Sequence, residues 1–120
     1  MKKIGFLLLV LFTACSDNDS DTACTEEYVP GLIVIVKDAE TGKVLEEGVV
    51  VTATDGAYNE DLDIISENSS YFYGAFERAG SYILSVYKEG YIDYTSDTIE
   101  AGADRCHVIT EEVTVELQPE

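Results

Sequence analysis

The chain has 120 residues, enough for one domain, and its composition is strongly acidic. Seven lysine and arginine residues stand against 24 aspartate and glutamate residues, so the formal net charge is −17 at pH 7. Nucleic acid and anionic lipid headgroups repel such a chain, which argues against a nucleic-acid partner. Because the acidic residues are spread along the sequence, we expect them to form a solvated surface.

The first 14 residues predict a secretory leader. Two lysines precede an apolar run from Ile4 to Phe12, and a small pair, Thr13-Ala14, stands directly before Cys15. The run is too short to cross a bilayer as a helix, which takes about 20 apolar residues. We therefore expect residues 1–14 to be a signal peptide that is removed.

The small pair followed by a cysteine resembles a bacterial lipoprotein signal. This resemblance implies that Cys15 is acylated and becomes the first residue of the mature chain. Several acyl chains on one residue anchor a protein stably. The alternative is an ordinary cleaved leader with a cysteine nearby by chance.

Residues 15–29 are predicted to be the lipidated cysteine and an acidic flexible tether. The run at 16–22 is polar and acidic and has no large apolar residue. It resembles the Ser/Asp-rich signal that sends some Gram-negative lipoproteins to the cell surface; the alternative is a simple spacer. We expect an outer-membrane lipoprotein on the cell surface or, otherwise, on the periplasmic face.

Two further cysteines, Cys24 and Cys106, form an even pair in a chain that is predicted to be exported. We predict a disulfide between them, with two free buried thiols as the alternative. The loop that this bond closes is long, and the chain-entropy model gives about 4–5 kcal/mol of stabilisation for such loops.

From residue 30 to residue 120 the apolar pattern has a period of two and predicts an all-β domain. Short β-branched and aromatic runs alternate with turn residues, and no stretch carries a helical apolar stripe. About seven short strands of this kind are typical of a two-layer β-sandwich. The predicted strands cover residues 32–36, 49–54, a short segment within 59–70, then 71–76, 81–88, 91–99 (bent) and 107–117.

Four motifs in this region resemble carboxypeptidase regulatory-like domains. They are D-A-E-T-G at residues 38–42, A-G-S-Y-I-L-S-V at 79–86, G-Y at 90–91 and V-T-V-E-L at 113–117. The resemblance implies a single Greek-key, transthyretin (prealbumin)-like β-sandwich. It also implies a non-catalytic accessory or binding module, since that family as a rule catalyses no reaction.

His107 is the single histidine, so any histidine-based catalytic triad needs it together with a nucleophile and an orienting carboxylate. Its neighbour Cys106 is committed to the predicted disulfide, so we expect His107 to be a strand-edge residue and the chain not to be an enzyme. One histidine and two bridged cysteines also argue against a zinc site. We predict no metal and no cofactor.

The densest acidic cluster beyond the tether contains Asp55, Glu60, Asp61 and Asp63. Calcium prefers six to eight oxygen ligands, and the spacing differs from the twelve-residue calcium loop. We favour a solvated loop, and calcium binding by the segment from Asn59 to Ser70 stays open.

Four tyrosines, Tyr71, Tyr73, Tyr91 and Tyr94, are candidates for a ligand-facing aromatic surface. Such surfaces stack on sugar rings or form protein hot spots. The alternative is that alternate tyrosines fill the core.

Together these features predict a membrane-anchored, non-catalytic binding or structural module whose partner is an unknown protein or glycan. One alternative is an accessory subunit in a surface system that captures glycans. An alternative of a different class is a hydrolytic enzyme that depends on His107.

Overall fold

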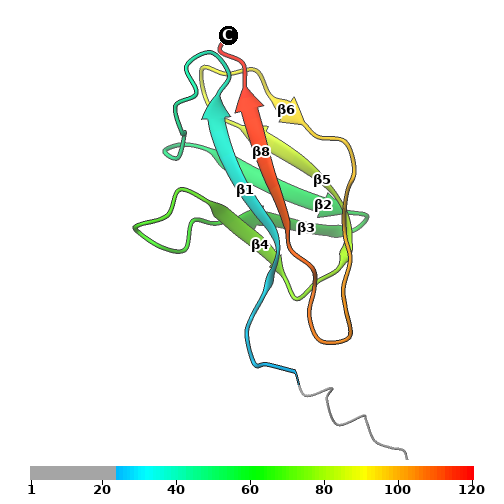
Figure 1. The fold of residues 1–120 in the computed structure, drawn as a ribbon. Coiled ribbons are helices and arrows are strands. Elements are labelled where there is room, and N and C mark those ends of the chain that lie inside the picture. The colour runs from blue at the N-terminus through cyan, green and yellow to red at the C-terminus, as the bar shows by residue number, and fades with distance from the viewer. Residues whose placement is uncertain (1–23) are drawn as a thin grey trace, which may run out of the picture.

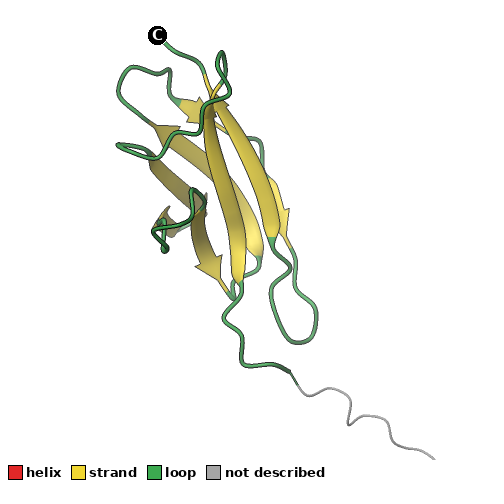
Figure 2. Ribbon diagram, turned by 60° about the vertical axis from the view of Figure 1, so that its left-hand side comes forward, coloured by secondary structure: helices red, strands yellow, loops and turns green. Residues whose placement is uncertain are grey.

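A computed structural model describes residues 24–120, and the predicted leader, Cys15 and the first part of the tether lie outside the described residues. Eight strands form two sheets that pack face to face, as Figures 1 and 2 show. The predicted all-β sandwich is therefore confirmed, with eight strands instead of about seven. From residue 24 to residue 120 no helix is long and apolar enough to cross a membrane.

The three-stranded sheet has the order β4-β1-β8. Strand β1 (Pro30–Asp38) is central, β4 (Phe72–Phe76) pairs with it antiparallel, and β8 (Glu111–Leu117) pairs with it parallel. The parallel register runs without a break from Leu32 opposite Glu111 to Asp38 opposite Leu117. The β-branched run of β1 predicts a strand that is buried on both faces or lies at the centre of a sheet. The structure places it at the centre, with alternate residues buried.

The second sheet has the order β3-β2-β5-β6. Its strands are β2 (Val50–Asp55), β3 (Tyr58–Leu62), β5 (Gly80–Tyr87) and β6 (Tyr94–Thr95), and β7 (Ile99–Ala101) also pairs with β5. The chain crosses between the two sheets after β1, β3, β4 and β7. Residues far apart in sequence therefore meet across the sandwich.

The core is built from alternate residues that point between the sheets. In β5 Tyr82, Leu84 and Val86 are buried, whereas Ile83 and Tyr87 on the other face are exposed. This is the alternation that the sequence of β5 predicts. The other fully buried members come from the strands that face or flank β5: Leu32, Val34, Val36, Val51, Ala53, Ala75, Val115 and Leu117.

The predicted bent strand over residues 91–99 is two short strands, β6 and β7. Both pair with β5, β6 near its end and β7 near its start. Between them the Ser96 hydroxyl accepts a hydrogen bond from the Leu84 backbone N–H at 2.9 Å and donates to the carbonyl of Asp97 at 2.7 Å. The side chain thus takes the place of a backbone acceptor and interrupts the ladder.

The predicted strand over residues 107–117 begins only at Glu111. Residues 102–110 form a loop that is closed by a bridge between Ala103 and Val108. His107 lies in this loop, so its expected position at a strand edge is wrong. The Asp104 carboxylate accepts the backbone N–H groups of Cys106 and His107, each at 2.8 Å, which holds this part of the chain in a turn.

Arg78 closes one end of the sandwich. Its guanidinium lies 3.8 Å from the centroid of the Tyr58 ring and donates hydrogen bonds to Asp55 and to the Tyr82 hydroxyl, each at 3.1 Å. Burial and a hydrogen bond to Glu60 raise the pKa of Tyr58 above its usual value. These contacts keep the polar ends of two core tyrosines paired.

Truncation of a core residue in β5 tests this packing. We expect Leu84→Ala to lower the free energy of unfolding by about 2–5 kcal/mol, because it removes buried methyl groups and leaves a cavity. The matched control, Ile83→Ala on the exposed face of the same strand, should cost less than about 1 kcal/mol. Urea denaturation measures both, and equal losses would contradict the assignment of the two faces.

Candidate functional site

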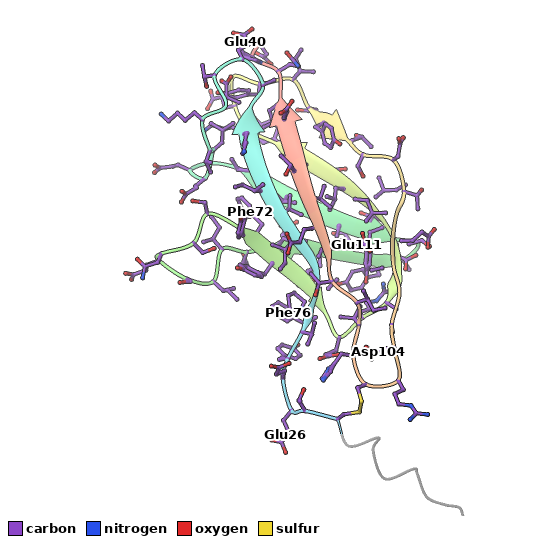
Figure 3. All side chains as sticks on the ribbon, viewed as in Figure 1. Glu26, Glu40, Phe72, Phe76, Asp104 and Glu111 are labelled. Atoms are coloured by element: carbon purple, nitrogen blue, oxygen red, sulfur yellow. A yellow bond between two sulfur atoms is a disulfide. The ribbon has the colours of Figure 1, made fainter. Side chains whose placement is uncertain are left out.

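The strands run between two ends of the molecule, which we call the anchor pole and the groove pole. The anchor pole contains residues 24–29 and the loop 102–110, and the groove pole contains the loop after β1, the turn between β5 and β6, and the C-terminus. Figure 3 shows Glu26 and Asp104 at the first pole and Glu40 at the second. The sandwich therefore separates the start of the described chain from the groove pole by the length of its strands.

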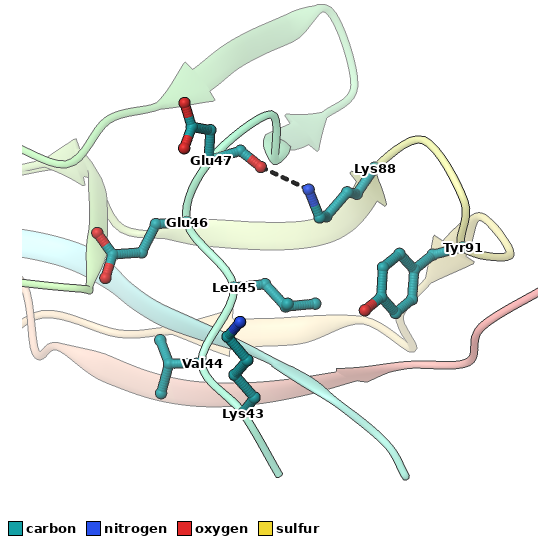
Figure 4. Close-up of a pocket in the computed structure, with 7 residues that line it drawn as sticks. All are labelled: Lys43, Val44, Leu45, Glu46, Glu47, Lys88 and Tyr91. Atoms are coloured by element: carbon teal, nitrogen blue, oxygen red, sulfur yellow. Dashed lines mark hydrogen bonds between the residues drawn. The ribbon is translucent and has the colours of Figure 1, made fainter. Parts of the chain in front are cut away.

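A groove of about 710 Å³ lies at the groove pole. Figure 4 shows the Leu45 side chain pointing toward the Tyr91 ring, with Lys43 and Lys88 on either side. The residues that line the groove are Lys43, Val44, Leu45, Glu46, Glu47, Lys88 and Tyr91.

Asp38 organises this pole from the end of β1. One of its carboxylate oxygens accepts the backbone N–H groups of Glu40 at 2.7 Å and Thr41 at 2.9 Å, and the other accepts the Tyr91 hydroxyl at 2.7 Å. Gly42 closes the same turn with a positive φ of 77°, which glycine adopts without strain. One carboxylate thus joins the loop after β1 to the wall of the groove.

Among residues 24–120, Asp38 is the one charged residue that is buried. The hydrogen bond from Tyr91, followed by the N–H group of Thr41, holds the pKa of Asp38 below its ordinary value of 3.8. The same hydrogen bond raises the pKa of Tyr91. Asp38 therefore stays ionised and Tyr91 stays protonated at neutral pH.

The opposite wall of the groove is held by Lys88. Its ammonium group donates a hydrogen bond of 2.7 Å to the backbone carbonyl of Glu47. The Glu46 carboxylate accepts a hydrogen bond of 2.7 Å from the Ser70 hydroxyl, which ties this loop to the segment before β4. The lining loop is thus fixed by contacts to two other segments of the chain.

The groove lining carries equal numbers of basic and acidic side chains, although the chain as a whole is strongly acidic. Residues 24–120 contain five lysine and arginine residues, and two of them line the groove. Two carboxylates, an apolar Val44–Leu45 pair and one aromatic ring complete the lining. Such a surface can donate and accept hydrogen bonds around an apolar patch, as polar small-molecule sites do.

At the anchor pole the predicted disulfide between Cys24 and Cys106 is confirmed, with a Cα–Cα distance of 5.3 Å. Next to it the His107 ring joins two side chains. Its Nε2 atom lies 2.9 Å from the Thr25 hydroxyl, and its Nδ1 atom lies 2.7 Å from the Glu77 carboxylate. Neither Thr25 nor Glu77 is predicted from the sequence to contact His107.

A hydroxyl, an imidazole and a carboxylate in this order have the connectivity of a nucleophile, a base and an orienting group. Here, however, Glu77 also accepts the backbone N–H of Val29 at 2.9 Å and donates its own N–H to the Val29 carbonyl at 2.7 Å. The hydrogen bond from the Val29 N–H to the carboxylate, followed by the bond from His107, lowers the pKa of Glu77. The hydrogen bonds of His107 and Glu77 thus hold residues 24–29 against the domain. We assign this hydrogen-bonded group the role of a clamp.

Aromatic stacking strengthens this clamp. The Tyr28 ring stacks on the Phe76 ring with 4.6 Å between their centroids. We use the name anchor clamp for Cys24, Cys106, His107, Glu77 and the contacts that they make to residues 25–29.

The four candidate tyrosines do not lie on one face. Tyr71 and Tyr73 lie at β4 in the three-stranded sheet, and Tyr71 is 44% exposed. Tyr91 lines the groove, and Tyr94 lies on β6 and packs partly against the core. The structure therefore brings one of the four, Tyr91, to the groove, and a ligand-facing role for all four stays a prediction.

The side chains of the predicted acidic cluster contact different partners. Asp55 pairs with Arg78, Glu60 accepts the Ala75 N–H at 2.9 Å, and Asp61 accepts the Thr52 hydroxyl at 2.8 Å. In residues 24–120 no group of three or more histidine, cysteine, aspartate or glutamate side chains is arranged to hold a metal ion.

A scan against protein-family models finds no match to this chain, and a search of curated proteins finds no similar sequence.

The buried carboxylate of Asp38 makes a pH dependence testable. Because its folded-state pKa lies below 3.8, its contribution to stability is complete above that value and is lost as the pH falls through the folded-state pKa. We expect Tyr91→Phe, which removes the largest cause of the shift, to flatten the loss of unfolding free energy as the pH falls below about 4. Chemical denaturation across this range measures it, and identical pH profiles for the two proteins would contradict the assignment.

Proposed function

We propose that this chain is a lipid-anchored lipoprotein whose β-sandwich is a non-catalytic binding module, with its binding site in the groove. The observation that carries the proposal is the separation of the two poles. The chain enters the domain at the anchor pole, and the loop after β1, which lines the groove, begins at the other end of that strand (Figure 1). A lipid on the mature N-terminus would therefore leave the groove facing away from the membrane.

The sequence distance supports this arrangement. Cys15 precedes Cys24 by nine positions, and such a segment spans at most about 30 Å when fully extended. The anchor clamp would thus stay near the lipid surface. A disulfide is also typical of exported proteins, which agrees with the predicted leader.

Two observations support a binding role without catalysis. The single histidine is committed to the anchor clamp by Glu77 and Thr25. The resemblance to carboxypeptidase regulatory-like domains implies an accessory module. Exposure on the cell surface, suggested by the Ser/Asp-rich tether, remains part of the proposal.

A glycan is the ligand class that the groove favours. The partly exposed Tyr91 ring, backed by the buried Leu45, offers an aromatic surface to the C–H face of a sugar, and the lysine and glutamate groups can donate and accept hydrogen bonds to hydroxyls. The chain would then serve as an accessory subunit that captures glycans. A protein partner that places a polar segment in the groove is the alternative.

The anchor is tested by metabolic labelling of cells with an alkyne fatty acid. We expect the wild-type chain to carry the label and Cys15→Ser to lose it, because the acylated sulfur is absent. The matched control is a variant with Cys24→Ser and Cys106→Ser, which should keep the label. Protease treatment of intact cells then reports whether the domain is exposed, and an unlabelled wild-type chain would rule out the lipid anchor.

The groove is tested on a glycan array with matched charge variants. Lys88→Gln removes an ammonium group from the groove, and Arg105→Gln removes one positive charge near the anchor pole. We expect Lys88→Gln to weaken binding of any retained glycan by about fivefold or more and Arg105→Gln to leave it unchanged. Equal losses would assign the binding to net charge, and retention of no glycan would refute the glycan ligand.

A further inference from the structure

We propose that the domain bears tension between its two poles, and that the parallel β1–β8 pair and the Cys24–Cys106 disulfide are the elements that carry it. This inference rests on the proposed function, in which one pole is attached to a membrane and the other holds a ligand. A ligand that is fixed to another body would pull on the groove pole while the lipid holds the anchor pole.

The first argument is the direction of β1. Its start continues directly into residues 24–29 at the anchor pole, and its end at Asp38 continues into the groove loop. A pull on Tyr91, which pairs with Pro119 just after β8, reaches the anchor clamp through β8, its pairing with β1 and the disulfide. A pull on Lys43 follows β1 directly to the anchor clamp. Because β1 is already extended, tension along this path lengthens it little.

The second argument is the pairing of β1 with β8. The two strands are parallel and share seven registered pairs, from Leu32–Glu111 to Asp38–Leu117. Figure 1 shows both arrowheads at the groove pole, next to the C-terminus. A pull on the start of β1 against the end of β8 slides the strands past each other, so all the hydrogen bonds between them resist at once. A pull that peels one strand away breaks the same bonds one after another.

The third argument is the position of the disulfide. It joins Cys24, where the chain enters the domain, to Cys106, five residues before β8 begins at Glu111. With the bond intact, tension between the N-terminal side of Cys24 and the C-terminus passes through the disulfide and along β8. Residues 25–105 are then excluded from that path. Reduction returns the tension to the β1–β8 pair.

Single-molecule pulling on the full chain, with handles at its two ends, tests both elements. With the disulfide intact we expect no unfolding step for the loop that it closes. After reduction we expect one step of roughly 27–30 nm, since the two cysteines are 82 positions apart and each residue adds about 3.3–3.6 Å. A full-length step in the oxidised protein would overturn the role of the disulfide.

The decisive comparison changes only the direction of the pull. In the reduced protein, handles at the N- and C-termini load β1 and β8 in shear, whereas handles at Glu40→Cys and the C-terminus peel β8 from β1. Cys15, Cys24 and Cys106 are replaced by serine for this second attachment, and the same triple variant is also pulled from its ends.

We expect the unfolding force in shear to exceed the peeling force at least threefold. Equal forces would overturn the proposal. Where the serine variant fails to fold, the wild-type chain in reducing buffer still provides the shear measurement, and a force no higher than that for opening an ordinary β-hairpin would overturn the proposal there. Because no ligand or lipid takes part, the result is independent of whether the anchor or the glycan site is correct.

Discussion

The pairing of β1 on both sides is the constraint on which the rest of this structure depends. Leu32, Val34 and Val36 point into the core from the middle of the three-stranded sheet. Strand β1 is hydrogen-bonded to β4 along one edge and to β8 along the other. A shift of β1 by one residue would turn these side chains out of the core. The burial of β1 therefore fixes the position of its two ends, and with them the two poles.

Each pole lies at one end of β1. At the groove pole, the carboxylate of Asp38 holds the loop after β1 and the Tyr91 hydroxyl, which makes one wall of the groove a direct continuation of the strand. At the anchor pole, Glu77 bonds Val29 immediately before β1, and the disulfide joins the same segment to the loop before β8. The proposed attachment and the proposed binding site are thus two ends of one rigid element.

Much of this architecture could be predicted from the sequence because its signals are local. The period-two pattern of β5 predicts that Ile83 and Leu84 lie on opposite faces, and the even pair of cysteines predicts the disulfide. The break between β6 and β7 could not be predicted, because it depends on the Ser96 hydroxyl meeting the backbone of Leu84. Serine at that position has no local signature that distinguishes it from an ordinary strand residue.

The candidate site was predictable only in part, for the same reason. The segment from Asp38 to Lys43 predicts a turn in which Gly42 can adopt a positive φ, and the structure contains that turn. The contact of Asp38 with Tyr91 joins residues more than fifty positions apart, and the groove lining comes from two such distant segments. Likewise, nothing in the sequence near His107 points to Thr25 or Glu77, since the fold alone brings them together.

Energy transfer to labelled lipid measures whether the anchor and the groove lie at opposite ends of the molecule. In the lipidated protein on vesicles, a dye is attached at Glu26→Cys near the anchor clamp or at Glu40→Cys at the groove pole, with an acceptor dye in the membrane. The account predicts strong transfer from residue 26 and clearly weaker transfer from residue 40. Equal transfer from the two positions, or stronger transfer from residue 40, would contradict it.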